Sequence, residues 1–132
     1  MSTIRAVMQP NPITVGPDYS IQAAVGLLIK NHFSGLPVVS GDNSILGILS
    51  EKDVLKAFYE TDCTTVGSLM TRDPTTFSVD APLVDVVDCL MTYDFRRVLI
   101  HDAGKLVGLV SRADLMPVVM MALLDHIGES AE

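Results

Sequence analysis

The stretch Met8-Gln9-Pro10-Asn11-Pro12-Ile13-Thr14-Val15 decides the fold, because its pattern returns 62 residues later as Met70-Thr71-Arg72-Asp73-Pro74-Thr75-Thr76-Phe77. Met, Pro and Thr keep the same spacing in both copies, and Asp18 matches Asp80 at the same interval. A repeat of this size is one supersecondary unit, and such a unit does not bury its apolar face alone. The sequence therefore predicts two related halves that pack against each other.

The segments after each copy predict the same elements in the same order. Apolar residues at helical spacing indicate one amphipathic helix in each half. Two short apolar strands joined by a tight turn follow each helix, as in an antiparallel hairpin. Each half then has the order strand, helix, strand, strand, helix, and we predict an α/β (α+β) fold with a pseudo-two-fold axis. The helical positions are Ile21, Ala24, Val25, Leu28 and Ile29, matched by Leu83, Val86, Val87, Leu90 and Met91.

Composition narrows the functional classes. Of the 132 residues, 48% are hydrophobic and 19% are charged, which is enough apolar side chain for a core. Without an apolar run of about 18 residues, or a secretion signal at the start, we expect a cytoplasmic protein and no membrane partner. The net charge of −7 disfavours a nucleic-acid partner. The spacing of Cys63, Cys89, His32, His101 and His126 predicts neither a disulfide nor a metal site.

The doubled pattern resembles the cystathionine-β-synthase-type (CBS) domain family, in the paired arrangement called a Bateman module. The resemblance runs from about residue 8 to 116 and is carried in the first half by the Met8 stretch, Leu36-Pro37-Val38-Val39 and Gly47-Ile48-Leu49-Ser50-Glu51-Lys52-Asp53. In the second half it is carried by the Met70 stretch, Val98-Leu99-Ile100 and Gly108-Leu109-Val110-Ser111-Arg112-Ala113-Asp114. It implies repeats at residues 8–59 and 70–127, the second with a C-terminal helix, and a linker at 60–69.

The resemblance also implies what such a module binds. Clefts between the repeats would hold AMP, ADP, ATP or S-adenosylmethionine, two chains would form a homodimer, and a further protein would be regulated. We find no nucleophile–base pair and no Walker-type loop, so we expect no enzyme activity. No cofactor is expected, and magnesium only alongside bound ATP. The alternative is a dimerisation or protein-interaction module without a ligand.

Two Ser-x-x-Asp pairs, Ser50 with Asp53 and Ser111 with Asp114, allow two interpretations. Each pair stands where a strand passes into a helix, so the serine hydroxyl and the free N–H groups can face a phosphate, and the carboxylate suits ribose hydroxyls. The resemblance assigns them this role. The same spacing is also that of a capping box, which satisfies the helix without a ligand.

Four further residues complete the predicted ligand site. Thr14 and Thr76 stand on the first predicted strand of each half, which lines the cleft in the family; both are also ordinary strand formers. Arg96 and Arg97 precede a hairpin strand where the first half has Ser34 and Gly35. An arginine fork suits phosphate, although a surface role that balances Asp94 or Asp102 is the alternative. We expect the arginines to serve one cleft and Ser34 with Gly35 the other.

The C-terminal segment predicts a helix that is apolar on more than one side. Such a helix needs a second partner, and a homodimer contact is our preferred interpretation. Pro117 should kink or restart the helix, because it cannot donate to the preceding turn. The apolar residues are Leu115, Met116, Val118, Val119, Met120, Met121, Ala122, Leu123 and Leu124.

Overall fold

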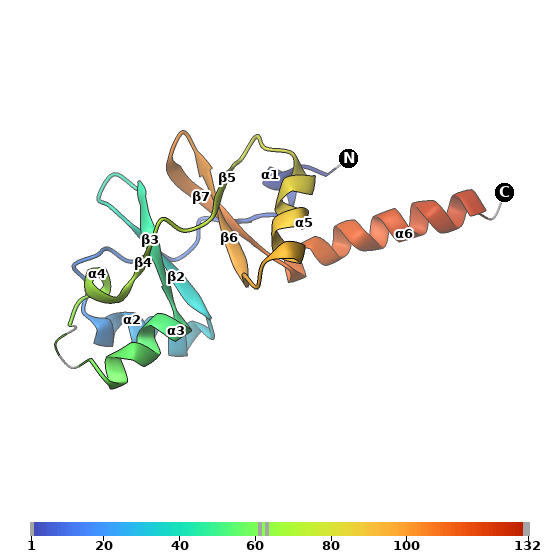
Figure 1. The fold of residues 1–132 in the computed structure, drawn as a ribbon. Coiled ribbons are helices and arrows are strands. Elements are labelled where there is room, and N and C mark those ends of the chain that lie inside the picture. Colours follow the sequence, from blue (N-terminus) through green and yellow to red (C-terminus); the bar gives the residue numbers. More distant parts are fainter. Residues whose placement is uncertain (1, 61, 63, 131–132) are drawn as a thin grey trace.

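The computed structural model describes residues 2–60, 62 and 64–130. Two lobes of strands and helices lie side by side, and a long C-terminal helix runs away from them (Figure 1). The first half of the chain forms α1 (Ile4–Val7), β1 (Gln9–Pro10), α2 (Ile21–Asn31), β2 (Gly35–Val39), β3 (Ile45–Ser50), α3 (Glu51–Leu55) and the 3₁₀ turn η1 (Lys56–Phe58). The second half forms α4 (Val66–Leu69), β4 (Thr71–Arg72), β5 (Thr76–Ser78), α5 (Leu83–Thr92), β6 (Arg97–Asp102), β7 (Lys105–Ser111), the 3₁₀ turn η2 (Ala113–Leu115) and α6 (Met116–Ser130).

The two halves exchange the short strands β1 and β4, which precede the first strand predicted for each half. One sheet has the order β1-β7-β6-β5 and the other has the order β2-β3-β4. β1 therefore pairs with the hairpin of the second half, and β4 pairs with the hairpin of the first half. Both pairings are antiparallel and only two residues long. Each sheet is completed by residues from the other half of the chain, so neither half is a self-contained unit.

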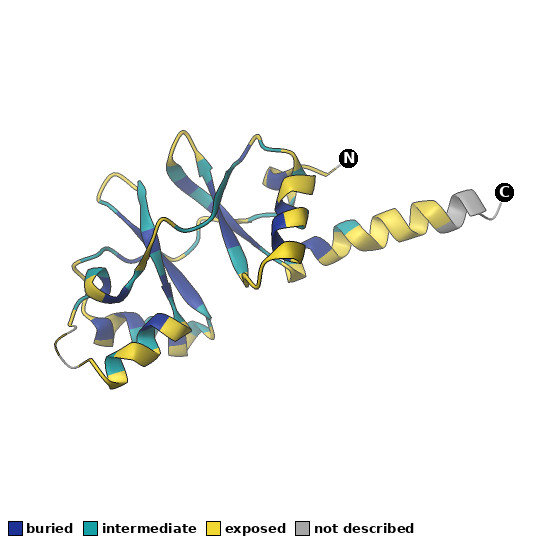
Figure 2. Ribbon diagram, in the orientation of Figure 1, coloured by how far each residue is buried: buried dark blue, intermediate teal, exposed yellow. Residues whose placement is uncertain are grey.

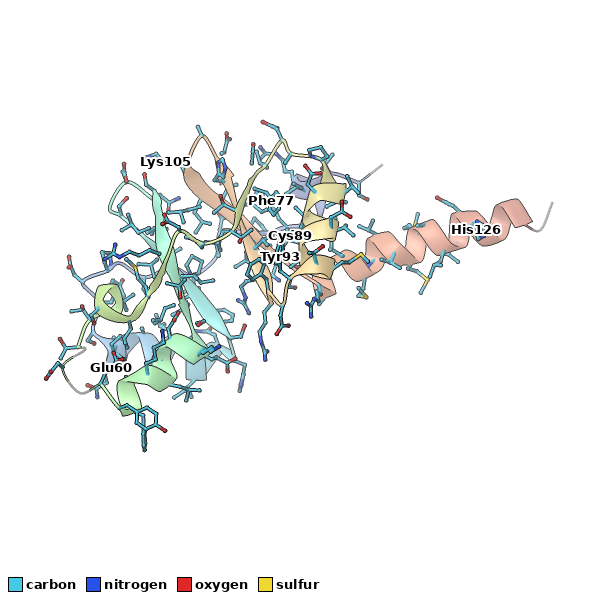
Figure 3. All side chains as sticks on the ribbon, in the orientation of Figure 1. Glu60, Phe77, Cys89, Tyr93, Lys105 and His126 are labelled. Carbon is cyan, nitrogen blue, oxygen red and sulfur yellow. The ribbon has the colours of Figure 1, made fainter. Side chains whose placement is uncertain are left out.

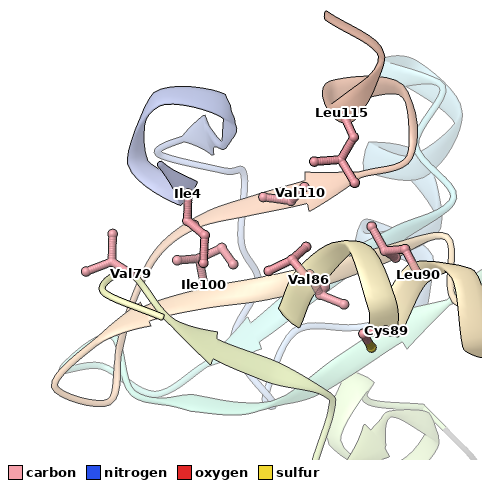
Figure 4. Close-up of a cluster of buried hydrophobic side chains, with 9 residues drawn as sticks. Ile4, Val79, Val86, Cys89, Leu90, Ile100, Val110 and Leu115 are labelled. Atoms are coloured by element: carbon pink, nitrogen blue, oxygen red, sulfur yellow. The ribbon is translucent and has the colours of Figure 1, made fainter. Parts of the chain in front are cut away.

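The short helices follow the same exchange. The lobe built on the sheet β1-β7-β6-β5 is called the second lobe, and the lobe built on β2-β3-β4 the first lobe. Ile4 of α1 is buried in the hydrophobic core of the second lobe, against Val79, Val86 and Ile100 (Figure 4). Val66 and Leu69 of α4 are buried in the core of the first lobe. α4 lies inside the range predicted as a linker, 60–69, of which Thr61 and Cys63 lie outside the described residues. The limits proposed for the repeats and the linker stay predictions.

The predicted hairpins and amphipathic helices are present, and the Ser20 hydroxyl caps α2 by accepting from the Ala23 N–H at 3.0 Å. The first strand of the first half is shorter than expected. It is reduced to a single parallel bridge between Val15 and Val38, and Thr14 lies just before it. Pro12 and Pro17 flank this bridge, and a proline has no N–H to donate to a strand ladder.

A third hydrophobic cluster holds the lobes together. Val39 of β2 packs with Leu99, Leu106 and Leu109 of the second half, and all four side chains are buried. At the hairpin tips, Ser44 bridges to Lys105, its own counterpart in the repeat. The two hairpins therefore meet at the pseudo-two-fold axis.

α6 begins at Met116, so Pro117 stands in its first turn, as the sequence predicts. The helix has few contacts with the lobes and is largely exposed (Figure 2). Apolar side chains contribute to that surface, since Met121 is 60% exposed and Leu123 53%. Among the residues described, no helix combines the length and the apolar character that a bilayer crossing requires.

A candidate ligand cleft between the two repeats

A cleft of about 630 Å³ opens between the two halves of the chain. The first half supplies the segment before β2 and the turn where β3 passes into α3. The second half supplies the segment after β4 and the segment that leads into β6. The lining residues are Ser34, Gly35, Ile48, Ser50, Glu51, Lys52, Leu55, Thr71, Asp73, Pro74, Thr75, Asp94, Phe95, Arg96, Arg97 and Leu99. Because both halves build the wall, its shape depends on how the halves pack.

Arg97 is a half-buried cation in this wall. Burial, followed by the repulsion of Arg96, lowers the pKa of its guanidinium, while Asp114 and Glu51 act in the opposite direction. A terminal guanidinium nitrogen donates a hydrogen bond to the Ser34 hydroxyl. Within the described residues, no carboxylate oxygen lies within 4.0 Å of Arg97. The charge is thus partly removed from water without a directly paired anion.

Arg96 lies beside Arg97 in the same wall and is exposed. The structure places both arginines in the cleft that Ser34 and Gly35 also line. Our expectation that these two pairs of residues serve separate clefts is therefore wrong. The segments before β2 and before β6 meet across the boundary between the halves, which the alignment of the repeats does not reveal.

Ser50 and Asp53 form a complete capping box at the start of α3. The Asp53 carboxylate accepts from the Ser50 N–H at 2.9 Å and from the Ser50 hydroxyl at 2.9 Å. The Thr71 hydroxyl of β4 reaches its two oxygens at 3.0 and 3.1 Å. Asp53 is only 4% exposed and does not line the cleft, whereas Ser50 does. Asp53 thus holds Ser50 and β4 in place without lining the cleft itself.

Ser111 and Asp114 repeat this arrangement in the second half. The Asp114 carboxylate accepts from the Ser111 N–H at 2.7 Å and from the Ser111 hydroxyl at 3.0 Å. The Gln9 side-chain amide approaches its two oxygens at 3.1 and 3.0 Å. Gln9 is the repeat counterpart of Thr71, so each exchanged strand is tied to the aspartate of the other half. Neither Ser111 nor Asp114 lines the 630 Å³ cleft.

Thr14 and Thr76 are half-buried, and neither lines the cleft. The neighbour of Thr76, Thr75, lines the cleft instead, because side chains along a strand alternate between its two faces.

Two further lining residues, Lys52 and Phe95, were not predicted from the sequence. Phe95 stacks on Tyr93 with ring centroids 5.4 Å apart, and an aromatic pair beside the arginines was a visible signal. No group of three or more potential metal ligands occurs in the parts of the chain that the structure describes.

Comparisons with known proteins agree with this architecture. The structure resembles CBSX2 in complex with AMP, a protein of Arabidopsis thaliana, with a TM-score of 0.83 and 29% identity over 92% of this chain and 98% of that one. It also resembles the CBS domain pair of the protein MJ0100, in complex with 5′-methylthioadenosine and S-adenosyl-L-methionine. There the TM-score is 0.79, with 26% identity over 92% of this chain and 98% of that one.

A sequence relative and a family model complete the comparison. An uncharacterized protein of Methanocaldococcus jannaschii is 25% identical over 115 residues, which is 86% of this chain but 41% of the relative. The chain thus spans less than half of the length of that relative. The model of the CBS domain matches residues 4–60 and again residues 66–120. The chain therefore belongs to the CBS domain family, as a tandem pair of repeats.

Proposed function

We propose that the chain is a regulatory ligand-sensing module, which binds AMP, ADP, ATP or S-adenosylmethionine in the cleft between its repeats. The observation that carries the proposal is the half-buried Arg97, which has no carboxylate oxygen within 4.0 Å among the described residues. A charge that is partly removed from water needs a counter-ion. A phosphate group matches the planar fork of a guanidinium, which favours the phosphorylated members of this ligand set.

The size of the cleft and the relatives support the same proposal. Its volume of about 630 Å³ falls in the range of small-molecule pockets, roughly 300–1,000 Å³. The two solved CBS pairs described above were crystallised with AMP and with methylthioadenosine and S-adenosylmethionine. Arg96, Arg97 and Ser50 are proposed to contact the phosphate, with Asp53 holding Ser50 in place. A counterpart site at Ser111 and Asp114 is also proposed, and Thr14 and Thr76 stay predicted ligand contacts.

Regulation follows from the position of the cleft. A ligand shifts a packing equilibrium only when it binds one arrangement better than another. Because both halves supply the wall, a bound ligand favours the arrangement in which Arg97 and Ser50 reach it together. We propose binding without catalysis, in a cytoplasmic setting, and we propose that another protein responds to the change.

Isothermal titration calorimetry with adenosine, AMP, ADP, ATP and S-adenosylmethionine tests the proposal. We expect at least one phosphorylated ligand to bind, and Arg97→Gln to weaken that binding at least about tenfold, in line with loss of a charge-assisted bond. Arg72→Gln removes an exposed arginine of β4 outside the cleft and should leave the affinity unchanged. Absence of both heat and thermal shift with every ligand at millimolar concentration would reject the proposal.

A specific observation favours a second function, assembly with another copy of the chain. Large apolar side chains are exposed at equivalent positions of both repeats. The pairs are Ile29 (70% exposed) with Met91 (80%), Leu55 (68%) with Met116 (56%), Phe58 (84%) with Val119 (47%), and Tyr59 (85%) with Met120 (56%). Two equivalent apolar patches on one chain suit a second copy that covers both around a two-fold axis.

Analytical ultracentrifugation distinguishes this function. We expect a dimer, and we expect the double change Phe58→Ser with Val119→Ser to shift it towards monomer, whereas changing the exposed Asp80 to Asn should not. Dimerisation accompanies either function, so ligand binding separates them. A ligand-free module predicts that Asp114→Ala lowers the melting temperature without altering any binding property, because the aspartate then serves only Ser111 and Gln9.

A further inference from the structure

Arg97 bridges the boundary between the two halves. It is the first residue of β6, and its guanidinium donates to the hydroxyl of Ser34, which stands just before β2. A guanidinium carries five N–H donors in one plane. The bond to Ser34 therefore leaves donors for a ligand while it fixes the plane in which they lie.

Ser34 is itself held in place by the backbone around it. Its carbonyl oxygen accepts from the N–H of Glu51, the first residue of α3, at 3.0 Å. At the next residue, Gly35, an added Cβ would lie 3.1 Å from the Leu49 carbonyl oxygen, so this segment is pressed closely against β3. The hydroxyl is thus presented from a fixed backbone, next to the turn that carries Ser50.

Without this hydroxyl the guanidinium has other partners within electrostatic reach. The carboxylates of Asp114 and Glu51 both act on Arg97, and the attraction between opposite charges decays slowly in a partly buried site. Glu51 lines the cleft, whereas Asp114 lies outside it. The side chain would then turn towards Asp114, which acts more strongly on the guanidinium than Glu51 does. Its donors would no longer be directed into the cleft for a ligand.

We infer that Ser34 is a positioning residue for the ligand phosphate, because it orients the Arg97 guanidinium across the boundary between the two halves. The inference rests on the proposed function. Since Ser34 belongs to the first half and Arg97 to the second, phosphate binding is coupled to the packing of the halves. The coupling is reciprocal, so a phosphorylated ligand strengthens the contact that orients its own binding group.

The test compares AMP with adenosine, which share every group except the phosphate. Affinities for both are measured by calorimetry for the unaltered chain, Ser34→Ala, Ser34→Thr and Ser44→Ala. We expect Ser34→Ala to weaken AMP binding about tenfold and to leave adenosine binding within about twofold, while Ser34→Thr keeps a hydroxyl and retains AMP binding. Ser44→Ala is the matched control, because Ser44 accepts from Lys105 across the same boundary but lies outside the cleft.

The outcomes separate the inference from the function on which it rests. An unaltered chain that prefers AMP to adenosine, with the same preference in Ser34→Ala, overturns the role of Ser34 and leaves the proposed function standing. An equal loss of AMP and adenosine binding also overturns it, since that marks general damage to the cleft. If the unaltered chain binds neither compound, ADP and ATP take the place of AMP in the same comparison, and the proposed function fails first when none of its ligands binds. Ser34→Gly provides a second variant without the hydroxyl should Ser34→Ala not fold.

Discussion

Asp53 supports the candidate site without lining it. Its carboxylate accepts from three donors, the Ser50 N–H, the Ser50 hydroxyl and the Thr71 hydroxyl. These bonds join the cap of α3 to the exchanged strand β4. A buried carboxylate that is saturated in this way orders the wall of the cleft and has little capacity left for a ribose.

Replacing Asp53 by Asn should therefore destabilise the fold. An asparagine keeps one acceptor oxygen, and the Thr71 hydroxyl can accept from its NH₂ group. The bonds from Ser50 lose their charge assistance, however, and the ion pair of the carboxylate with the Lys56 ammonium at 3.8 Å is lost. We expect a loss of about 2 kcal/mol in the free energy of unfolding, measured by urea denaturation.

Asp114→Asn is the matched comparison. Asp114 has the equivalent bonds but is only partly buried, so water can replace a lost partner, and we expect a loss of at most about 1 kcal/mol. Equal losses at the two positions would contradict the assigned role of burial.

The sequence identified Arg96, Arg97 and Ser50 as candidates, and all three line the cleft. It could not identify Ser34 as the partner of Arg97, because a repeat alignment pairs equivalent positions and says nothing about contacts near the pseudo-two-fold axis. It also allowed both roles for Ser50 with Asp53. The capping geometry is now visible, and the ligand role of Ser50 stays a prediction.

At the level of elements, amphipathic helices and hairpins were predictable because their periodicity is local. The exchange of β1 and β4 was not, since each of these strands is two residues long and carries no pattern of its own. What permits the exchange is the absence of a side chain at one position of each hairpin. An added Cβ at Gly47 would lie 2.5 Å from the Thr71 carbonyl oxygen, and one at Gly108 would lie 2.9 Å from that of Gln9.

Gly47→Ala should accordingly displace β4. A backbone oxygen cannot move aside as a flexible side chain can, so we expect a loss of about 2–3 kcal/mol in stability, typical of overpacking, measured by thermal and urea unfolding.

Gly26→Ala is the control, for which we expect a gain in stability instead of a loss. Gly26 is exposed in α2, an added Cβ there meets no atom within 4 Å, and alanine is the better helix former. We expect a gain of up to about 1 kcal/mol. A neutral Gly47→Ala would show that the exchanged strand tolerates displacement.

At the level of the whole molecule, the lobes meet through the buried cluster around Leu99 and through a polar clasp at the hairpin tips. Lys105 of the clasp is labelled in Figure 3. Its ammonium donates to the Asp42 carboxylate at 2.8 Å and to the Ser44 hydroxyl at 3.1 Å. The Asn43 side chain adds a bond to the Leu106 carbonyl oxygen at 2.8 Å. The contact between the lobes thus has one apolar and one electrostatic component.

The ion pair between Asp42 and Lys105 predicts that the thermal stability of the protein depends on pH. Lys105, followed by the hydroxyl of Ser40 and the groups of Ser44, holds the pKa of Asp42 well below its ordinary value. A depressed folded-state pKa stabilises the protein above the unfolded value of about 3.9, and this stabilisation is lost as the pH falls below it. The melting temperature of the unaltered chain should therefore exceed that of Asp42→Asn at pH 7, and the difference should shrink progressively below about pH 4.

Lys105→Met provides the check, because it removes the group with the largest influence on Asp42. In that background Asp42→Asn should change the melting temperature little at pH 7, and added salt should reduce the original difference, since the pair is exposed and screened. A difference that persists unchanged through acid and salt would assign the effect of Asp42 to its hydroxyl bonds in the hairpin turn. The contact between the lobes would then depend on the apolar cluster and on the hydrogen bonds of Asn43 and Ser44, with little contribution from the ion pair.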